Sequence, residues 1–352
     1  MRRIENFYDN NFGIARLIAA FLVLFTHGFE LVADLSDEPV YTCTNGKLRC
    51  STIGLYIFFF TSGYLVTKSF IETPNVGEFI WKRFLRIIPA LLFIVLLSVL
   101  LIGPIFTLLP LNIYFTQADT YRYLFTSSGL YIRHILPGVF TGSQHYDHGI
   151  NGSLWSISLE IKLYISLIFF GYFIKKGIKN IITLVVIAAI ILDIIVLLNL
   201  FDLQRYLNPL HFNLLVIFWI GSLSSINYKK IFLSSRILFV AGISWLICLY
   251  YFEPLRIFLE IPFFCYLTLF CCYSGKSISL KADLSYGIYL YAFLITQIFV
   301  ELLGKIYPLF LIIMVTAVVI IFSLASWTFI EKKSLSLKKY YLKLFSNRLD
   351  YK

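Results

Sequence analysis

Long apolar runs, separated by short polar connections, follow one another along almost the whole chain. A helix needs about 20 mostly apolar residues to cross the hydrocarbon core of a bilayer. About ten runs approach that length, and each predicts a membrane-spanning helix. The sequence therefore predicts an all-α integral membrane bundle that spans the bilayer over about residues 12–330. The predicted spans are roughly 12–33, 52–71, 85–109, 153–174, 181–200, 209–226, 237–252, 257–274, 284–303 and 308–330.

The composition supports a chain that lives in lipid. Hydrophobic residues make up 59% of the sequence and charged residues only 14%, with a mean hydropathy of +0.82. Soluble domains carry about 25% charged residues, so a water-exposed globule, a disordered chain and a collagen are excluded. The net charge of +11 does not indicate nucleic acid, because the cations lie between apolar runs and form no single basic stripe. The bilayer is the expected partner.

The distribution of cations predicts that both ends of the chain face the cytoplasm. In that orientation about three quarters of the 30 Lys and Arg residues lie on the cytoplasmic side, as the positive-inside rule requires. Residues 331–352 form a Lys-rich tail, which we expect on the anionic cytoplasmic leaflet. We expect a single membrane domain over residues 1–352, without an internal repeat or an appended soluble domain.

Two segments on the outer side are unusual. Residues 110–152 are long for a connection between spans, which indicates a functional loop or a re-entrant cap. Cys43 and Cys50 bracket a polar segment on the same side. They form either a disulfide or two free thiols, since spacing alone does not decide between these states.

The first predicted span carries two polar residues that a bilayer tolerates poorly, Arg16 and His27. Eleven helical positions come close to three full turns, so both side chains share one face about 16 Å apart along the axis. This face suits a ligand that is anionic at one end and reactive at the other. The alternatives are that Arg16 anchors the helix at the cytoplasmic surface and that His27 caps the helix end.

The fourth predicted span opens with NGSLWSISLE, which places Glu160 about two turns below the outer surface. This is close to the predicted depth of His27, and an imidazole beside a carboxylate is a common construction for a general base. A structural ion pair of Glu160 with Lys162 or with an Arg is the alternative. We assign Trp155 and Asn151 to substrate binding, although an interfacial aromatic belt would also explain Trp155.

A cluster of cations, Lys82, Arg83 and Arg86, lies at the predicted cytoplasmic end of the third span. Arg83 and Arg86 are neighbours on a helix face, and such clusters bind phosphates well. Topogenic anchoring competes with that interpretation. In the second span, Ser62 and Gly63 predict close helix packing.

The outer segment GSQHYDHGIN brings His145, Asp147 and His148 close together in sequence. A metal site needs three or four converging ligands, and this spacing alone is a weak signal for one. We therefore expect no metal. We assign His145 and His148 to contact with the acceptor, with plain loop polarity as the alternative.

Five features together resemble the membrane acyltransferase-3 family, in order from about residue 10 to near residue 330. They are the Arg16 to His27 spacing and the segments FFFTSGYL, RFLRIIP, NGSLWSISLE and LSYGIYLYAFLI. The resemblance implies a ten-helix bundle that transfers an acyl group, usually acetyl from acetyl-CoA, to a hydroxyl of an extracytoplasmic glycan or lipid-linked sugar. It also implies roles at the matching positions: Arg16 and His27 as the essential pair, Arg83 and Arg86 with the donor, and Glu160 near the active centre.

The sequence departs from the family at one position, where Ala292 replaces a His that many members carry. In this respect the chain is similar to members that modify exopolysaccharide or O-antigen. We expect a membrane O-acetyltransferase of the bacterial inner membrane that uses acetyl-CoA as co-substrate and a surface polysaccharide sugar as acceptor. A non-enzymatic carrier for a lipid-linked sugar is the main alternative, and the missing internal repeat counts against it. A structural partner in a polysaccharide assembly complex is a further one.

Overall fold

A computed structural model describes residues 2–32, 35–73, 75–141, 149–178, 180–197, 208–304 and 306–341. These residues are mostly helical and cluster into two compact units. Unit 1 comprises Met1–Val23, Glu38–Glu72 and Leu163–Lys281, and unit 2 comprises Leu24–Asp37, Thr73–Lys162 and Ala282–Lys352.

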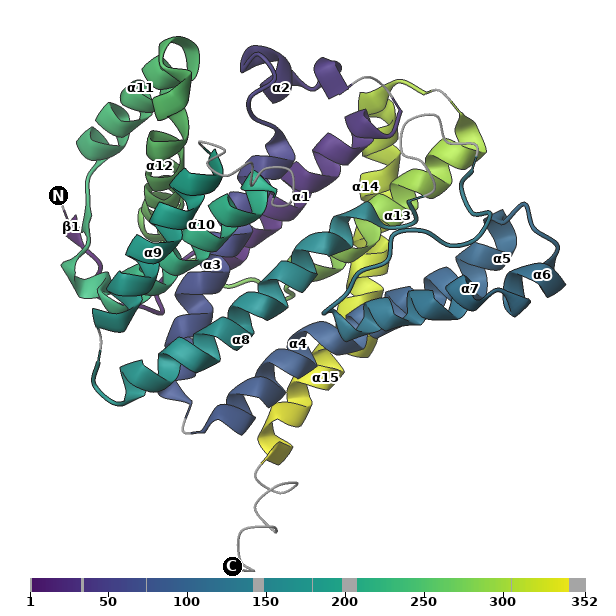
Figure 1. Cartoon of the computed structure of the whole chain (residues 1–352), viewed down its shortest axis with the longest axis horizontal. Helices are drawn as coiled ribbons and strands as arrows, with labels where there is room; N and C mark the ends of the chain where they lie inside the picture. The colour runs from purple at the N-terminus through teal and green to yellow at the C-terminus, as the bar shows by residue number, and fades with distance from the viewer. Residues whose placement is uncertain are drawn as a thin grey trace, which may run out of the picture. The chain divides into compact units, whose positions relative to one another are not determined.

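The long helices match the predicted spans one for one (Figure 1). They are α1 Phe12–Glu30, α3 Cys50–Glu72, α4 Val76–Leu97, α8 Trp155–Lys175, α9 Asn180–Leu197, α10 Pro209–Ile226, α11 Ser235–Tyr251, α12 Glu253–Tyr273, α13 Ser285–Leu303 and α14 Pro308–Ser326. Nine helical stretches in the described residues are long and apolar enough to cross a membrane, and α11 is a shorter apolar helix. The all-α membrane bundle is confirmed.

The remaining elements are short. They are α2 Pro39–Cys43, α5 Gly103–Phe106, α6 Leu111–Thr116, α7 Ala118–Arg122 and α15 Lys332–Ser336, with π-helical turns at Ser98–Ile102 and Trp327–Glu331. Short 3-10 helices occupy Leu35–Asp37, Tyr123–Ser128, Gly152–Leu154, Tyr228–Lys230 and Leu337–Tyr340. Strand β1 (Arg2–Arg3) pairs antiparallel with β2 (Phe232–Leu233).

Two predicted bounds are wrong. The third span begins at Val76, well before residue 85, because Asn75 caps the helix by accepting a hydrogen bond from the Glu78 backbone N–H. The helix then continues through the π-turn to Phe106. The last helix does not end near residue 330 but continues to Tyr340 through the second π-turn, α15 and a 3-10 turn.

Small residues set the close packing of α3 against α10 in unit 1. A Cβ on Gly63 would collide with the backbone carbonyl of Phe218, and a Cβ on Gly221 would collide with that of Phe60. The prediction of close helix approach at Gly63 is therefore confirmed.

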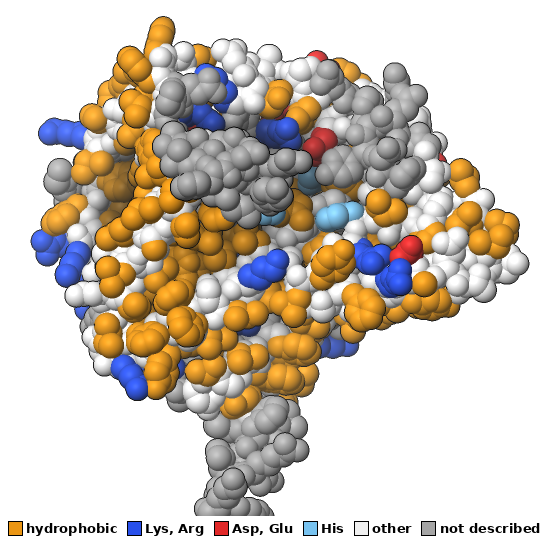
Figure 2. All heavy atoms as spheres, viewed as in Figure 1, with side chains coloured by type: hydrophobic (Ala, Val, Ile, Leu, Met, Phe, Trp, Pro, Cys, Tyr) orange, Lys and Arg blue, Asp and Glu red, His pale blue; other side chains and the backbone are white. Residues whose placement is uncertain are grey.

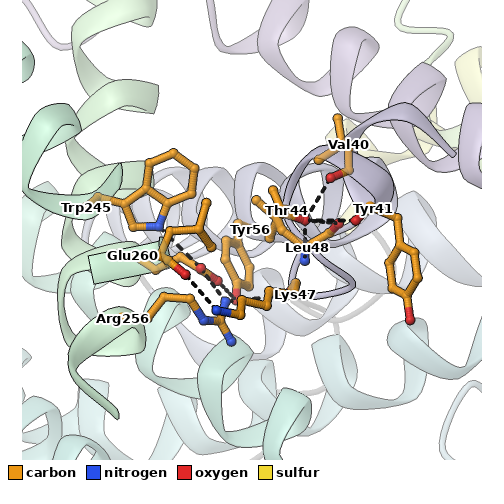
Figure 3. A network of polar contacts seen from close by, with 10 residues as sticks. Val40, Tyr41, Thr44, Lys47, Leu48, Tyr56, Trp245, Arg256 and Glu260 are labelled. Carbon is orange, nitrogen blue, oxygen red and sulfur yellow. Dashed lines mark hydrogen bonds and ion pairs between the residues drawn. The ribbon is translucent and has the colours of Figure 1, made fainter. Parts of the chain in front are cut away.

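A buried carboxylate on α12 links α3 and α11 within unit 1 (Figure 3). Glu260 on α12 is 1% exposed and accepts hydrogen bonds from Tyr56 Oη at 2.9 Å and Trp245 Nε1 at 3.3 Å. Arg256 forms an ion pair with the same carboxylate. A charge at this depth is tolerated because it is both paired and hydrogen-bonded.

Exposed apolar side chains cover much of the visible face of the molecule (Figure 2). Among the exposed apolar side chains of the described residues, Phe239 and Tyr251 on α11 and Phe169 on α8 are each more than 60% exposed. Such a surface suits lipid contact.

Cys43 and Cys50 are free thiols in the structure, which is the second of the two alternatives that the sequence left open.

The described part of the long segment 110–152 is folded into short elements. Asp119 on α7 accepts hydrogen bonds from Arg122 at 3.2 Å and from Arg133 at 3.0 Å. The hydrogen bond from Arg122, together with that from Arg133, holds the pKa of the Asp119 carboxyl below its usual value. The end of the segment contacts an earlier part of it, because the backbone N–H of Ile150 donates a hydrogen bond to the carbonyl of His134 at 2.7 Å.

Candidate active site

Helix α1 carries both Arg16 and His27 without interruption, so their spacing places them on one face of this helix. His27 lies in the last turn, and Glu30 is the final helical residue. Gly28 brings this turn close to α14, because a Cβ at that position would collide with the side chain of Ile312. The imidazole is thus held in a tightly packed place.

Glu30 orients the His27 ring. Nδ1 of His27 lies 3.0 Å from Oε2 of Glu30, and the two side chains are only 12% and 20% exposed. A carboxylate only accepts hydrogen bonds, so in the neutral ring Nδ1 carries the proton and Nε2 carries the lone pair. Nε2 is buried and has no hydrogen-bond partner among the described residues. The ring is therefore fixed in the form that can accept a proton at Nε2.

Helix α13 provides the wall beside the imidazole. The Phe293 ring meets the His27 ring edge-on, with 4.9 Å between the centroids. One turn further along α13, Gln297 is 1% exposed, and its amide nitrogen donates to the Gly149 carbonyl at 2.7 Å. Oε1 of Gln297 is buried without a partner among the described residues. Two buried acceptor atoms, on α1 and α13, thus have no donor in the part of the chain that the structure describes.

The start of α8 is fastened to α13 by buried polar side chains. The amide of Asn151 donates to the Leu290 carbonyl at 2.8 Å and accepts from Ser153 Oγ at 2.9 Å. Tyr289 Oη donates to the Ser153 carbonyl at 2.6 Å. The charge of Glu160 acts on the same Tyr289 hydroxyl. Asn151 therefore positions the backbone of α13 and the start of α8, while its predicted substrate contact stays a prediction.

Glu30, and not Glu160 as the sequence predicted, is the carboxylate that hydrogen-bonds His27. Glu30 takes Nδ1, and Nε2 bonds to nothing in the described chain, so Glu160 hydrogen-bonds neither ring nitrogen. The sequence signal for Glu30 was its position three residues after His27, where side chains on one helix face meet. Glu30 is the last residue of α1, near the expected end of the first span.

The cations of α4 lie together in unit 2 and are half-buried. Lys82 Nζ pairs with Glu78 at 2.7 Å. Arg83 lies over the Phe79 ring, with Cζ 5.8 Å from the centroid.

Arg86 forms an ion pair with Asp283, reaches Glu331 at 3.6 Å, and lies over the Tyr286 ring. Its two carboxylate partners come from the residues that flank α13 and α14. Arg86 therefore ties α4 to the ends of two other helices, a structural role that simple topogenic anchoring does not require.

The other predicted site residues are placed as follows. Arg16 is half-buried on α1, and Trp155 is half-buried at the first residue of α8. His145 and His148 lie outside the described residues. Within the described ranges, no group of three or more His, Cys, Asp and Glu side chains could hold a metal ion.

Known proteins with related sequences identify the class of this enzyme. A family model described as an acyltransferase domain matches residues 9–327. The chain is 31% identical over 340 residues to the O-acetyl transferase of Shigella phage Sf6, covering 93% of this chain and 96% of that protein. It is also 32% identical over 166 residues to Nodulation protein 10 of Rhizobium leguminosarum bv. viciae, covering 46% of this chain and 43% of that protein. No solved structure matches the chain significantly. The chain therefore belongs to the membrane acyltransferase-3 family and is an integral membrane acyltransferase.

Proposed function

We propose that this enzyme transfers an acetyl group from acetyl-CoA to a hydroxyl of a sugar in an extracytoplasmic or lipid-linked surface polysaccharide, in the inner membrane of a bacterium. The observation that carries the proposal is the buried His27, with Nδ1 held by Glu30 and Nε2 without a hydrogen-bond partner in the described ranges. The full-length similarity to a phage protein named O-acetyl transferase supports acetyl as the acyl group and oxygen as the acceptor atom.

The proposed chemistry is general base catalysis. Nε2 of His27 takes the proton from the sugar hydroxyl as its oxygen attacks the thioester carbonyl carbon. The new C–O bond forms, the C–S bond breaks, and the proton passes from the imidazolium to the leaving thiolate, which departs as CoA. Glu30 stabilises the imidazolium that forms between these two transfers, as the carboxylate does in a catalytic triad. Transfer through an acetyl group held on His27 uses the same residues.

In this proposal the donor is held from the cytoplasmic side. Arg83, Arg86 and Lys82 bind its phosphates, because guanidinium and ammonium groups form strong charge-assisted hydrogen bonds with phosphate. Arg16, on the same helix face as His27, guides the thioester arm between the two ends of the site. Since Arg86 already has carboxylate partners, its loss should weaken both donor binding and packing.

The acceptor in this proposal arrives from the outer side. Oε1 of Gln297 is a buried acceptor on the helix that contacts His27, so it can receive a hydrogen bond from a sugar hydroxyl. Trp155 offers an aromatic face for stacking on a sugar ring. His145 and His148 remain proposed acceptor contacts.

The proposed function is tested by comparing the surface glycan of a host that lacks this gene with that of the same host expressing the wild type or His27→Ala. Mass spectrometry of the repeat unit should show an acetyl-sized loss in the deletion strain and in the variant, and recovery with the wild type. Loss of the whole polymer in the deletion strain would indicate a carrier for a lipid-linked sugar. A fully acetylated glycan with inserted His27→Ala protein would refute the assignment of the base.

A further inference from the structure

The segment that follows the last spanning helix packs against α4. Beyond α14 the chain continues through α15 and the 3-10 turn Leu337–Tyr340, and Figure 1 shows α15 beside α4. The indole nitrogen of Trp81 donates to the Leu337 carbonyl at 3.3 Å. At Gly77 a Cβ would collide with the hydroxyl of Tyr341. These contacts hold residues 337–341 against the first turns of α4.

This packing brings a fourth cation, Lys338, into the cluster on α4. Lys338 is half-buried, and the charges of Arg83, Arg86 and Lys82 all act on it. Lys82 and Arg86 have carboxylate partners, at Glu78 for the lysine and at Asp283 and Glu331 for the arginine. Lys338 has no carboxylate partner in the described chain.

An ammonium group in this position is unfavourable without a ligand. Partial burial removes hydration from the charge, and three nearby cations repel it. The four-carbon stem could carry the charge outwards into water, as it does at many helix ends, yet the side chain lies half-buried in the cluster. An anion with several negative oxygens would reduce both costs, because it would hydrogen-bond the ammonium and attract the positive charges around it.

We propose that Lys338 completes a phosphate-binding site with Arg83 and Arg86, and that this site holds a phosphate group of the coenzyme portion of the donor. The assignment to the donor rests on the proposed function. The same phosphate chemistry occurs in the headgroups of anionic lipids, so the experiment has to separate these two sources.

The sequence supplies a matched control one residue away. Lys339 is exposed and lies over the ring of Tyr340, with Nζ 5.0 Å from the centroid. Lys338→Ala and Lys339→Ala remove the same charge from the same 3-10 turn, but only the first should affect the phosphate site. Lys338→Arg keeps the charge and tests whether a cation is what the site needs.

The probe is CoA itself, added to the full chain in nanodiscs of phosphatidylcholine alone, with binding measured by isothermal titration calorimetry. Lys338→Ala should weaken the Kd for CoA about tenfold, the equivalent of one charge-assisted hydrogen bond. Lys339→Ala should leave the Kd within about twofold, and Lys338→Arg should restore most of the affinity. A titration with CoA that lacks its 3′-phosphate then shows whether Lys338 contacts that phosphate. If it does, the wild type and Lys338→Ala should bind this form of CoA with the same Kd.

The same titrations in discs that contain phosphatidylglycerol separate donor from lipid. A wild-type Kd for Lys338→Ala in both kinds of disc, in protein with an unchanged melting temperature, overturns the proposal. So does a variant whose only defect is weaker retention of phosphatidylglycerol by native mass spectrometry. If Lys338→Ala fails to fold, the Lys338→Gln variant takes its place in the titration. Binding of CoA that depends on Lys338, in a wild type that transfers no acetyl group from acetyl-CoA, would defeat the proposed function and leave this site standing.

Discussion

Replacing Glu30 by Gln removes the charge beside His27 and keeps the size of the side chain. The account predicts a large loss of kcat, because a neutral amide stabilises the imidazolium much less than a carboxylate does. The amide can also donate to Nδ1, which would place the ring proton on Nε2 and block it as a base. The KM for acetyl-CoA should stay near the wild-type value, since Glu30 lies at the opposite end of the proposed site from the α4 cations.

The magnitude follows from the geometry. At the 3.0 Å between Nδ1 and Oε2, two unit charges attract by about 5 kcal/mol at an effective dielectric constant of about 20. About half of that attraction is expressed if the proton is half transferred in the transition state. The resulting 2–3 kcal/mol corresponds to roughly a hundredfold loss of kcat.

The assay measures release of CoA and acetylation of the host glycan by purified enzyme, with donor and acceptor varied separately. Glu30→Asp should recover part of kcat, because it restores the charge. Glu301→Gln makes the same chemical change at an exposed position on α13 and should be silent. In a His27→Gln background, Glu30→Gln should add no further loss, since both act through one imidazole. Wild-type kcat in Glu30→Gln, or full additivity of the two substitutions, would refute the reasoning.

Three further outcomes test other parts of the structure. Gly63→Ala should destabilise the protein by about 1–3 kcal/mol, because the new methyl collides with the Phe218 carbonyl. At Gly275 a new methyl would make only ordinary van der Waals contact, 4.0 Å from Nδ2 of Asn11, so Gly275→Ala should melt like the wild type in a thermal unfolding assay. Gln297→Leu should raise the KM for the glycan roughly 5- to 50-fold and leave the KM for acetyl-CoA unchanged, because it removes a buried hydrogen-bond acceptor. Since the pKa of Asp119 lies below its ordinary value of 3.8, the contribution of its ion pairs is present above that pH and is lost as the pH falls through the lower, folded-state pKa. Hydrogen exchange of the segment around Arg133, corrected for the intrinsic rate, should therefore rise at acid pH in the wild type and much less in Asp119→Asn.

The spanning helices were predictable because an apolar run of sufficient length has few stable arrangements other than a membrane helix. Their ends were harder to predict. The helix that contains Arg83 starts earlier than hydropathy indicates because Asn75 provides a cap, and a cap is a local hydrogen bond that a hydropathy window does not register. The last helix continues past the apolar run because its polar end packs on α4.

The site residues divide in a similar way. Arg16 and His27 stand out in sequence because charged and titratable groups are costly in a membrane. Glu30 stands out less, although its hydrogen bond to His27 follows from their spacing of three residues on one helix. Gln297 does not stand out, because the burial of its amide oxygen without a partner among the described residues depends on tertiary packing. Lys338 lies in a Lys-rich tail, where composition alone does not distinguish it from Lys339.

The most direct test of the account concerns Nε2 of His27. Purified His27→Gln protein in phosphatidylcholine discs should bind CoA as the wild type does and should lose about 10²- to 10⁴-fold in kcat for acetyl transfer, the usual contribution of a general base. A variant that keeps more than about a tenth of the wild-type kcat, with normal CoA binding, would show that the imidazole does not move the proton.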